Sequence, residues 1–463
     1  LPAREAARLI PARGLRAGDE AEAYQAPPRW GLTLGLLAIA ALSCLLPPLN
    51  GLPLGGYLAV ALILVGAVLA LPGLTPWAMR PLAGGRAILT RLARARLAAA
   101  PGQAVVAGAG VVASVALAVS MAIMVSSFRD SLDDWLTQML PADLYLRAAA
   151  AGTSGYLEPE WLDRVARLSG VTAVRPVRFE NLRIGAGGEA IALIARPVTD
   201  RAGLPLVAGT TAPEPGPATE PPAWISEAVA DRLRLGVADL IQLPLGQAVQ
   251  TFRVAGIWRD YARQQGAVVV ELETFQRLTG DRRVNDLGLF LAVGTDPSGV
   301  MSAIRDLLGA NLSEMILPGE LRTMILEVFD RTFLVTYLME AVAVMIGLFG
   351  ISTSFAALAT SRRKELGILR HLGLRRRQIG TLLATEAALT AAVGVVIGLV
   401  AGAVIAWILI EVINRQSFHW SMDMQWPLGV LLVFSLTMIL LAALAARLSG
   451  RQAMRQDAVL AVR

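Results

Sequence analysis

Few side chains in this sequence could carry out catalysis or bind a metal ion. The two histidines, His371 and His419, lie in segments that we expect on opposite sides of a membrane, so they cannot ligate one metal together. The single cysteine, Cys44, excludes an intrachain disulfide. The only lysine, Lys364, follows no G-x-x-x-x-G-K-[ST] loop, so we expect no nucleotide or other cofactor on this chain.

Carboxylate pairs are the remaining candidates for acid–base chemistry. Asp133 with Asp134, and Asp281 with Asp286, lie close together in the sequence. We interpret both pairs as solvated surface, because their segment is acidic and no G-x-S-x-G nucleophile elbow accompanies them. The sequence therefore predicts no catalytic site and no metal site.

The most distinctive stretch runs from Ser361 to Glu386 and reads S-R-R-K-E-L-G-I-L-R-H-L-G-L-R-R-R-Q-I-G-T-L-L-A-T-E. It predicts a short amphipathic helix with a charged beginning, and Gly373 is its expected stop. Its apolar side comprises Leu366, Leu369, Leu372 and Leu374. Such a helix between two membrane spans could press on a soluble partner and pull on both spans.

The elements on either side of this stretch are predicted to be membrane spans. The chain of 463 residues is 55% hydrophobic and only 17% charged, whereas soluble domains average about 25% charged residues. Runs of about 18 apolar residues can cross the ~30 Å hydrocarbon core of a bilayer. Six such runs occur, at 31–49, 54–74, 103–127, 333–360, 380–410 and 427–447.

Arginine distribution predicts the orientation of these spans. Basic residues concentrate in four segments that all fall on one side of the membrane, which the positive-inside rule assigns to the cytoplasm. We therefore expect cytoplasmic tails at 1–30 and 448–463, an amphipathic elbow helix at 79–102, and the short helix at 361–379. Residues 411–426 form an outer loop, and 31–78 hold the first two spans.

Residues 128–332 predict one large α/β extracytoplasmic domain on a helical stalk. Between residues 128 and 330 lie 26 of the 36 acidic and 19 of the 42 basic residues, so this segment carries −7 and the rest of the chain +13. The basic excess thus faces membrane lipids, which argues against a nucleic-acid partner. Expected helices lie at 158–168, 227–233 and 297–308, with stalk helices at 128–140 and 321–333. Expected extended segments lie at 171–177, 178–184, 190–196, 224–225, 240–243, 250–258 and 267–270, with a proline-rich linker at 212–222.

The stretch from Ser361 to Glu386 resembles the hallmark of the FtsX-like permease superfamily, which includes the MacB and LolC/LolE permeases. The matching residues are Arg363, Glu365, Leu366, Gly367, Ile368, Leu369, Arg370, Gly373 and Glu386. In that family this segment is the coupling helix that docks onto a nucleotide-binding subunit. The resemblance implies an ABC ATPase dimer as partner, which binds the ATP, and a second permease domain, in tandem or as a homodimer. It covers roughly residues 86–463.

A terminal repeat extends the resemblance. Residues 4–16 align without gaps to residues 451–463, with arginine at both ends of each copy. Because family members often end in such a tail, we interpret residues 1–16 as the end of a first permease domain outside this chain. Spans 31–49 and 54–74 would then join two tandem domains, as in ten-span permeases of the YbbP type.

Two features inside the predicted spans remain open to more than one interpretation. Gly394, Gly398 and Gly402 form a double G-x-x-x-G that permits close helix packing, either within this domain or against the paired permease domain. Glu340 lies one to two turns into its span, where it could couple protons or substrate, or be hydrated near the interface.

The resemblance implies a multi-pass permease of the bacterial cytoplasmic (inner) membrane. ATP hydrolysis by the partner would move the short helix, two spans and the extracytoplasmic domain, and so extract or export a lipid, a lipoprotein or another hydrophobic molecule. In the alternative function, the same motion activates a periplasmic esterase or other hydrolase without transport. A secondary transporter gated by Glu340 is the third hypothesis.

Overall fold

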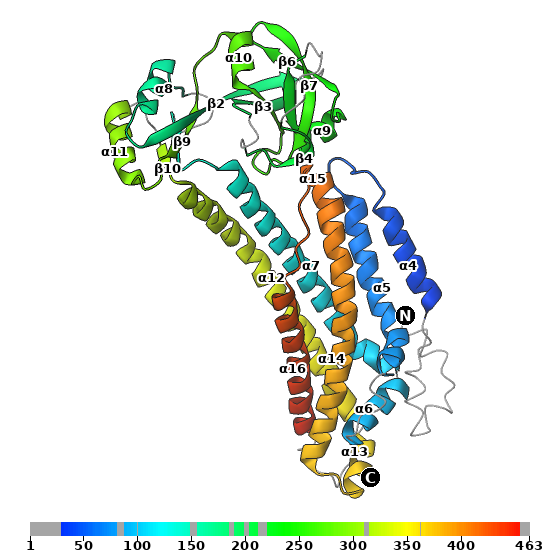
Figure 1. Cartoon of the computed structure of the whole chain (residues 1–463). Coiled ribbons are helices and arrows are strands. Elements are labelled where there is room, and N and C mark those ends of the chain that lie inside the picture. The colour runs from blue at the N-terminus through cyan, green and yellow to red at the C-terminus, as the bar shows by residue number, and fades with distance from the viewer. Residues whose placement is uncertain are drawn as a thin grey trace. The chain divides into compact units, whose positions relative to one another are not determined.

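The computed structural model describes residues 29–80, 88–99, 101–148, 155–184, 189–198, 203–211, 220–309, 314–361 and 363–453. The chain divides into two compact units. The membrane unit comprises Leu1–Ser127, Phe333–Gln416 and Met424–Arg463, and the sheet unit comprises Phe128–Thr332 with Ser417–Asp423. Figure 1 shows the elements of each.

The membrane unit is built from long apolar helices. Five helical stretches among the described residues are long and apolar enough to span a membrane: Leu54–Ala78, Gly108–Met139, Pro318–Ser354, Arg376–Phe418 and Leu428–Leu448. The helices that contribute to this unit are α4 (Trp30–Ser43), α5 (Leu54–Ala78), α6 (Ile88–Ala99), α7 (Pro101–Met139), α12 (Pro318–Ser361), α13 (Arg363–His371), α14 (Arg376–Trp407), a π-helix η3 (Ile408–Asn414), α15 (Arg415–Phe418) and α16 (Leu428–Ala453).

The first predicted span, 31–49, is wrong in length. Helix α4 has 14 residues, and at ~1.5 Å per residue it is about 21 Å long, shorter than a hydrocarbon core. Pro47 and Pro48 stop the apolar run from continuing as helix, because proline donates no backbone hydrogen bond. Leu49 and Leu52 then close a tight turn with two backbone hydrogen bonds of 3.0 Å. The other five predicted spans lie within long helices.

Helix α14 packs against several other helices of the membrane unit. It contacts α5, α6 and α16, and Figure 1 shows it between α5 and α16. Its continuation η3 packs on α5 through Ile413. A Cβ at Gly56 of α5 would lie only 2.5 Å from Cγ1 of Ile413, so the glycine allows this close contact. The predicted elbow at 79–102 contains α6, and Ala93 and Leu97 are its buried side chains among those described.

The sheet unit contains a mixed sheet of ten described strands in the order β10-β1-β9-β2-β3-β8-β5-β7-β4, with β6 paired to β7. The β3–β8 and β5–β7 pairs are parallel, and the other described pairs are antiparallel. The strands are β1 (Leu144–Arg147), β2 (Val171–Ile184), β3 (Glu189–Arg196), β4 (Leu206–Gly209), β5 (Pro222–Ser226), β6 (Leu240–Leu245), β7 (Ala248–Trp258), β8 (Ala267–Glu271), β9 (Asp286–Leu291) and β10 (Glu314–Ile316).

Strand β2 joins two separately packed halves of this unit. Its first part, to Val177, pairs with β9, and its second part, from Arg178, pairs with β3. One half holds a core of strand residues with helices α8 (Pro159–Ala166) and α11 (Pro297–Leu308). The other holds a larger core with α9 (Glu227–Leu233) and α10 (Leu272–Thr279). The middle of β2 is therefore the junction between two cores.

The structure shows the large mixed α/β domain that the sequence predicts. Helices α9 and α11 have the predicted bounds, and β2 and β3 form the predicted pair. Strands β1, β4, β9 and β10 were not predicted, because each is short or lacks alternating polarity. Of the proline-rich linker, residues 212–219 lie outside the described residues, and Pro222 begins β5.

Candidate functional site

The predicted coupling helix is α13, and Gly373 ends it as the sequence indicates. Gly373 has a φ of 96°, in the left-handed region. Its amide donates to the carbonyl of Arg370 at 3.0 Å, and the amide of Leu374 donates to the carbonyl of Leu369 at 3.1 Å. These two bonds are the Schellman pattern, which gives the helix a defined end.

The apolar residues of α13 divide between two environments. Leu369 and Leu374 pack against Ile379 and Leu383 of α14, so the short helix is fastened to the span that follows it. Ile368 and Leu372, in contrast, are 60% and 74% exposed. An exposed apolar pair on a helix that is packed against a membrane span is a surface to which another protein can bind.

The connection from α13 to α14 is short and hydrogen-bonded. The side chain of Gln378 accepts a hydrogen bond from the amide of Arg375 at 2.8 Å, and the amide of Gln378 donates to the carbonyl of Arg375 at 2.9 Å. Gly367 has open space where a Cβ would lie. The side chains of Arg363, Glu365 and Leu366 lie outside the described set.

The three motif glycines of α14 lie against α7 of the same chain. A Cβ at Gly394 would lie 3.0 Å from Cγ1 of Val111, and one at Gly398 would lie 2.7 Å from Cβ of Val115. At Gly402 the nearest atom is the carbonyl oxygen of Ala116, at 2.7 Å. The absent side chains thus let the two helices approach closely.

Glu386 and Glu340 lie within predicted spans. Glu386, the last residue of the motif, is only 2% exposed on α14. Glu340 is half-buried on α12. They lie on different helices.

The stalk ends of α7 and α12 contact each other within the sheet unit through ion pairs and an aromatic pair. Arg129 pairs with Asp330 at 3.1 Å, and Arg322 pairs with Asp133. The rings of Phe128 and Phe329 pack edge to face, with centroids 5.1 Å apart. These contacts tie the two helices together where they enter the domain.

The outer loop predicted at 411–426 has a segment, Ser417–Asp423, that packs as part of the sheet unit. Arg259 binds Asp423 at 3.0 Å and the hydroxyl of Ser421 at 3.0 Å. That hydroxyl also donates to Glu227 at 2.7 Å. We call Ser417–Asp423 the clamp segment.

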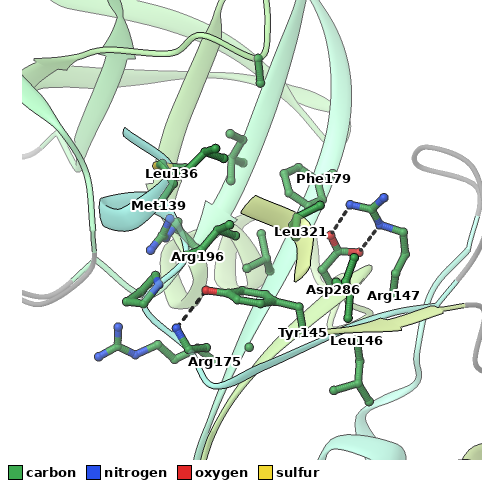
Figure 2. Close-up of a pocket in the computed structure, with 18 of the residues that line it drawn as sticks. Leu136, Met139, Tyr145, Leu146, Arg147, Arg175, Phe179, Arg196, Asp286 and Leu321 are labelled. Atoms are coloured by element: carbon green, nitrogen blue, oxygen red, sulfur yellow. Dashed lines mark hydrogen bonds and ion pairs between the residues drawn. The ribbon is translucent and has the colours of Figure 1, made fainter. Parts of the chain in front are cut away.

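The sheet unit also holds a cavity of about 390 Å³ at the junction of its two halves. Its wall combines the end of α7 and the start of α12 with strands β1, β2, β3, β9 and β10. Figure 2 shows Leu136 and Met139 on one side, and Phe179 with Leu321 on another. Its volume lies in the lower part of the ~300–1,000 Å³ range typical of small-molecule sites.

Charged and polar groups occupy two parts of the cavity wall. In one part, Asp286 pairs with Arg147 at 3.3 Å, and burial raises the pKa of Asp286 despite that pairing. In the other part lie Tyr145, Arg175 and Arg196. Burial raises the pKa of the Tyr145 hydroxyl, and burial lowers the pKa of the Arg196 guanidinium, an effect that the positive charge of Arg175 reinforces.

The interpretation of the aspartate pairs as solvated surface is wrong for Asp281 and Asp286. Asp281 is 17% exposed and binds Arg178 at 2.9 Å and Arg283 at 2.9 Å. Asp286 is 19% exposed, and Asp133 pairs with Arg322. Each carboxylate has an arginine from elsewhere in the unit as its partner, which sequence proximity does not reveal. Asp134 is exposed as predicted.

Two family models match this chain. Residues 337–458 match the FtsX-like permease C-terminal domain, and residues 104–308 match the MacB-like periplasmic core domain. These matches and the five long apolar helices identify a multi-pass membrane permease, whose C-terminal region is similar to FtsX-like permeases and whose sheet unit is similar to the MacB-like periplasmic core domain.

Individual relatives have the same kind of description. The chain is 26% identical to an uncharacterized ABC transporter permease protein of Mycobacterium tuberculosis, over 98% of this chain and 56% of that protein. It thus spans little more than half the length of that relative. The solved periplasmic region of MacB from Actinobacillus actinomycetemcomitans is 14% identical, covering 41% of this chain and 95% of that one, with a TM-score of 0.31. The extracellular domain of the ABC-type transporter YknZ from Gram-positive bacteria is 12% identical, covering 38% of this chain and 98% of that one, with a TM-score of 0.28.

Proposed function

We propose that this chain is the permease subunit of an ABC transporter whose ATPase is a separate cytoplasmic dimer. The observation that carries the proposal is helix α13, which is fastened to α14 through Leu369 and Leu374 and leaves Ile368 and Leu372 exposed. An ATPase that grips this exposed pair would move α14 directly, because the connecting turn is closed by hydrogen bonds.

The proposed cargo is a lipid, a lipoprotein or another hydrophobic molecule, handled at the outer face of a bacterial inner membrane. The paired stalk ends of α7 and α12 and the clamp segment give three places where movement of spans can reach the domain. A second permease domain, in tandem or as a homodimer, completes the transporter. In the apolar part of α12 only 6% of the residues are buried within this chain, compared with 61% in α7. Helix α12 therefore has exposed surface on which such a partner could pack.

A test of coupling uses the exposed pair on α13. We expect Ile368→Asp and Gly367→Asp to abolish co-purification of the ATPase and its stimulation by the permease, and Glu365→Arg to act in the same way. Leu92→Asp is the control, since Leu92 is 44% exposed on α6 and outside the proposed contact. If co-purification and stimulation are unchanged in the α13 variants, the coupling role is refuted.

Two other functions predict different results. If the chain only signals to a periplasmic hydrolase, ATPase-dependent hydrolase activation would occur with no movement of lipid. If Glu340 gates a secondary transporter, Glu340→Gln would abolish transport while ATPase coupling persists. The cavity of the sheet unit favours cargo handling, because a pure signal transducer needs no ligand-sized space.

A further inference from the structure

The cavity at the β2 junction has a consistent chemical layout. Most of its wall is apolar, from helices and strands alike, with Leu136, Met139, Ile194 and Ile325 among the lining residues. Such a surface favours hydrocarbon over water, since each buried methylene contributes to binding. A water molecule occupies ~30 Å³ in the liquid, and we take a methylene group to be of about the same size. The cavity of about 390 Å³ would then hold about a dozen methylene groups.

One part of the wall is polar and positively charged. On β9, Gly288 pairs with Tyr145 of β1 on one side and with Arg175 of β2 on the other. A Cβ at Gly288 would lie 3.1 Å from Cβ of Ala142, so the absent side chain keeps the floor between Tyr145 and Arg175 open. Arg196, at the end of β3, completes this group, and Figure 2 shows the three side chains on one side of the cavity.

Tyr145, Arg175 and Arg196 can all donate hydrogen bonds to a ligand oxygen. The Tyr145 hydroxyl accepts a hydrogen bond from the amide of Ala142 at 3.0 Å, which leaves its proton to donate. The Arg175 guanidinium stacks over the Phe290 ring at 4.7 Å from its centroid, which holds that side chain in place. The described lining has four arginines, but only two carboxylates, Asp286 and Glu314. The lining side chains alone therefore carry a positive formal charge, which Asp260 beside Arg263 and Glu271 near Arg196 partly offset from outside the lining.

We propose that this cavity binds the single acyl chain of an amphiphile whose anionic headgroup is held by Arg175, Arg196 and Tyr145. The inference rests on the proposed function, because it names the class of hydrophobic cargo. Guanidinium groups bind carboxylates and phosphates with charge-assisted hydrogen bonds. A cationic headgroup would be repelled by the two guanidinium groups, and a neutral alcohol would form no charge-assisted hydrogen bond between opposite charges with them.

The binding test uses the full chain in nanodiscs of zwitterionic phosphatidylcholine, without any ATPase. A diazirine derivative of dodecanoic acid is photo-cross-linked to the protein, and labelled peptides are located by mass spectrometry. We expect labels within residues 135–142 and 314–325, the segments of α7, β10 and α12 that line the cavity. Dodecanoate and dodecyl phosphate should compete, whereas dodecanol and dodecyltrimethylammonium should not. Competition by only one of the two anions would distinguish a carboxylate from a phosphate ligand.

Variants separate headgroup from chain recognition. Arg196→Gln should weaken competition by dodecanoate about tenfold or more, the loss expected for one charge-assisted contact, and Arg196→Lys should retain part of it. The matched control is Arg183→Gln, an exposed arginine on β2 outside the cavity. Ile325→Trp should block labelling by filling the space, whereas the neighbouring Met324→Trp should not, since Met324 is 54% exposed and does not line the cavity.

Equal competition by dodecanol, or labelling that survives both Arg196→Gln and Ile325→Trp, would overturn the inference. If Arg196→Gln does not fold, the pair Ile325→Trp and Met324→Trp still decides it. Cavity labelling that persists in a protein with no ATP-driven movement of lipid would refute the proposed function and leave this site standing. ATP-driven movement without cavity labelling would do the reverse.

Discussion

Close packing of α14 on α7 predicts that one added methyl group at Gly402 destabilises the membrane unit. The new Cβ would lie 2.7 Å from the carbonyl oxygen of Ala116 and 2.8 Å from Cβ of Val119. Both atoms are backbone or next to it, so neither can move aside by changing a rotamer. The two helices must therefore separate or shift along each other.

The magnitude follows from a comparison within one helix. Overpacking a close-fitted contact costs about 1–3 kcal/mol, while alanine gains ~1 kcal/mol over glycine in helix propensity. Gly380→Ala has the same gain in helix propensity, since both glycines lie in α14, so this gain cancels when the two variants are compared. Gly380→Ala causes no overpacking, because the nearest atom to its Cβ would be Cγ of Arg447 at 3.9 Å. We expect Gly402→Ala to be about 1–3 kcal/mol less stable than Gly380→Ala. Gly394→Ala, with its nearest contact at 3.0 Å, should fall near the lower end.

The measurement is the equilibrium unfolding of the full chain in mixed micelles, titrated with sodium dodecyl sulfate and followed by circular dichroism. The free energies of the variants are compared at one detergent fraction. Equal stability of Gly402→Ala and Gly380→Ala would refute the close approach of α14 to α7. It would also leave the double G-x-x-x-G free to contact a second permease domain instead.

Two further predictions concern the sheet unit. Arg259→Gln removes two 3.0 Å contacts with the clamp segment, so amide hydrogens of that segment should exchange faster; unchanged exchange would contradict the anchoring role. Burial raises the pKa of Asp260, which is only 3% exposed, despite its pairing with Arg263 at 3.3 Å. Because the folded protein then holds this proton more tightly than the unfolded chain, the contribution of Asp260 to stability falls as pH rises from about 3.8 through the raised pKa. The melting temperature of Asp260→Asn minus that of the wild type should therefore increase from pH 4 to 7, and a flat difference would contradict the burial argument.

The predicted span was right at 103–127 and too long at 31–49, where two consecutive prolines follow the helix; the separate prolines Pro72 and Pro76 lie inside α5 without ending it. The run at 103–127 has no proline and forms one helix, α7, with further residues at both ends. The run at 31–49 is as apolar, but it includes Pro47 and Pro48, and its helix ends at Ser43. Hydropathy counts side chains, whereas helix length also depends on backbone donors.

The two candidate sites differ in how far the sequence could reveal them. The Schellman end of α13 depends on residues within one short stretch, so Gly373 could be predicted as its stop. The cavity depends on Tyr145, Arg175 and Arg196, which come from three strands. Only the sheet order brings those strands together, and β1 was itself not predicted. A cluster of polar side chains that come from strands far apart in the chain produces no recognisable motif in the local sequence.

The clamp segment also bears on how many independent movements the domain retains. A rigid body attached at two points can still swing about the line that joins them, as a door does on its hinges. Here the chain passes between the two units at four places, after Ser127, Thr332, Gln416 and Asp423. The last two passages bracket the clamp segment, which Arg259 and Glu227 hold. Cutting the chain within it would remove a covalent constraint on the swing, so the domain would respond less completely when the spans move.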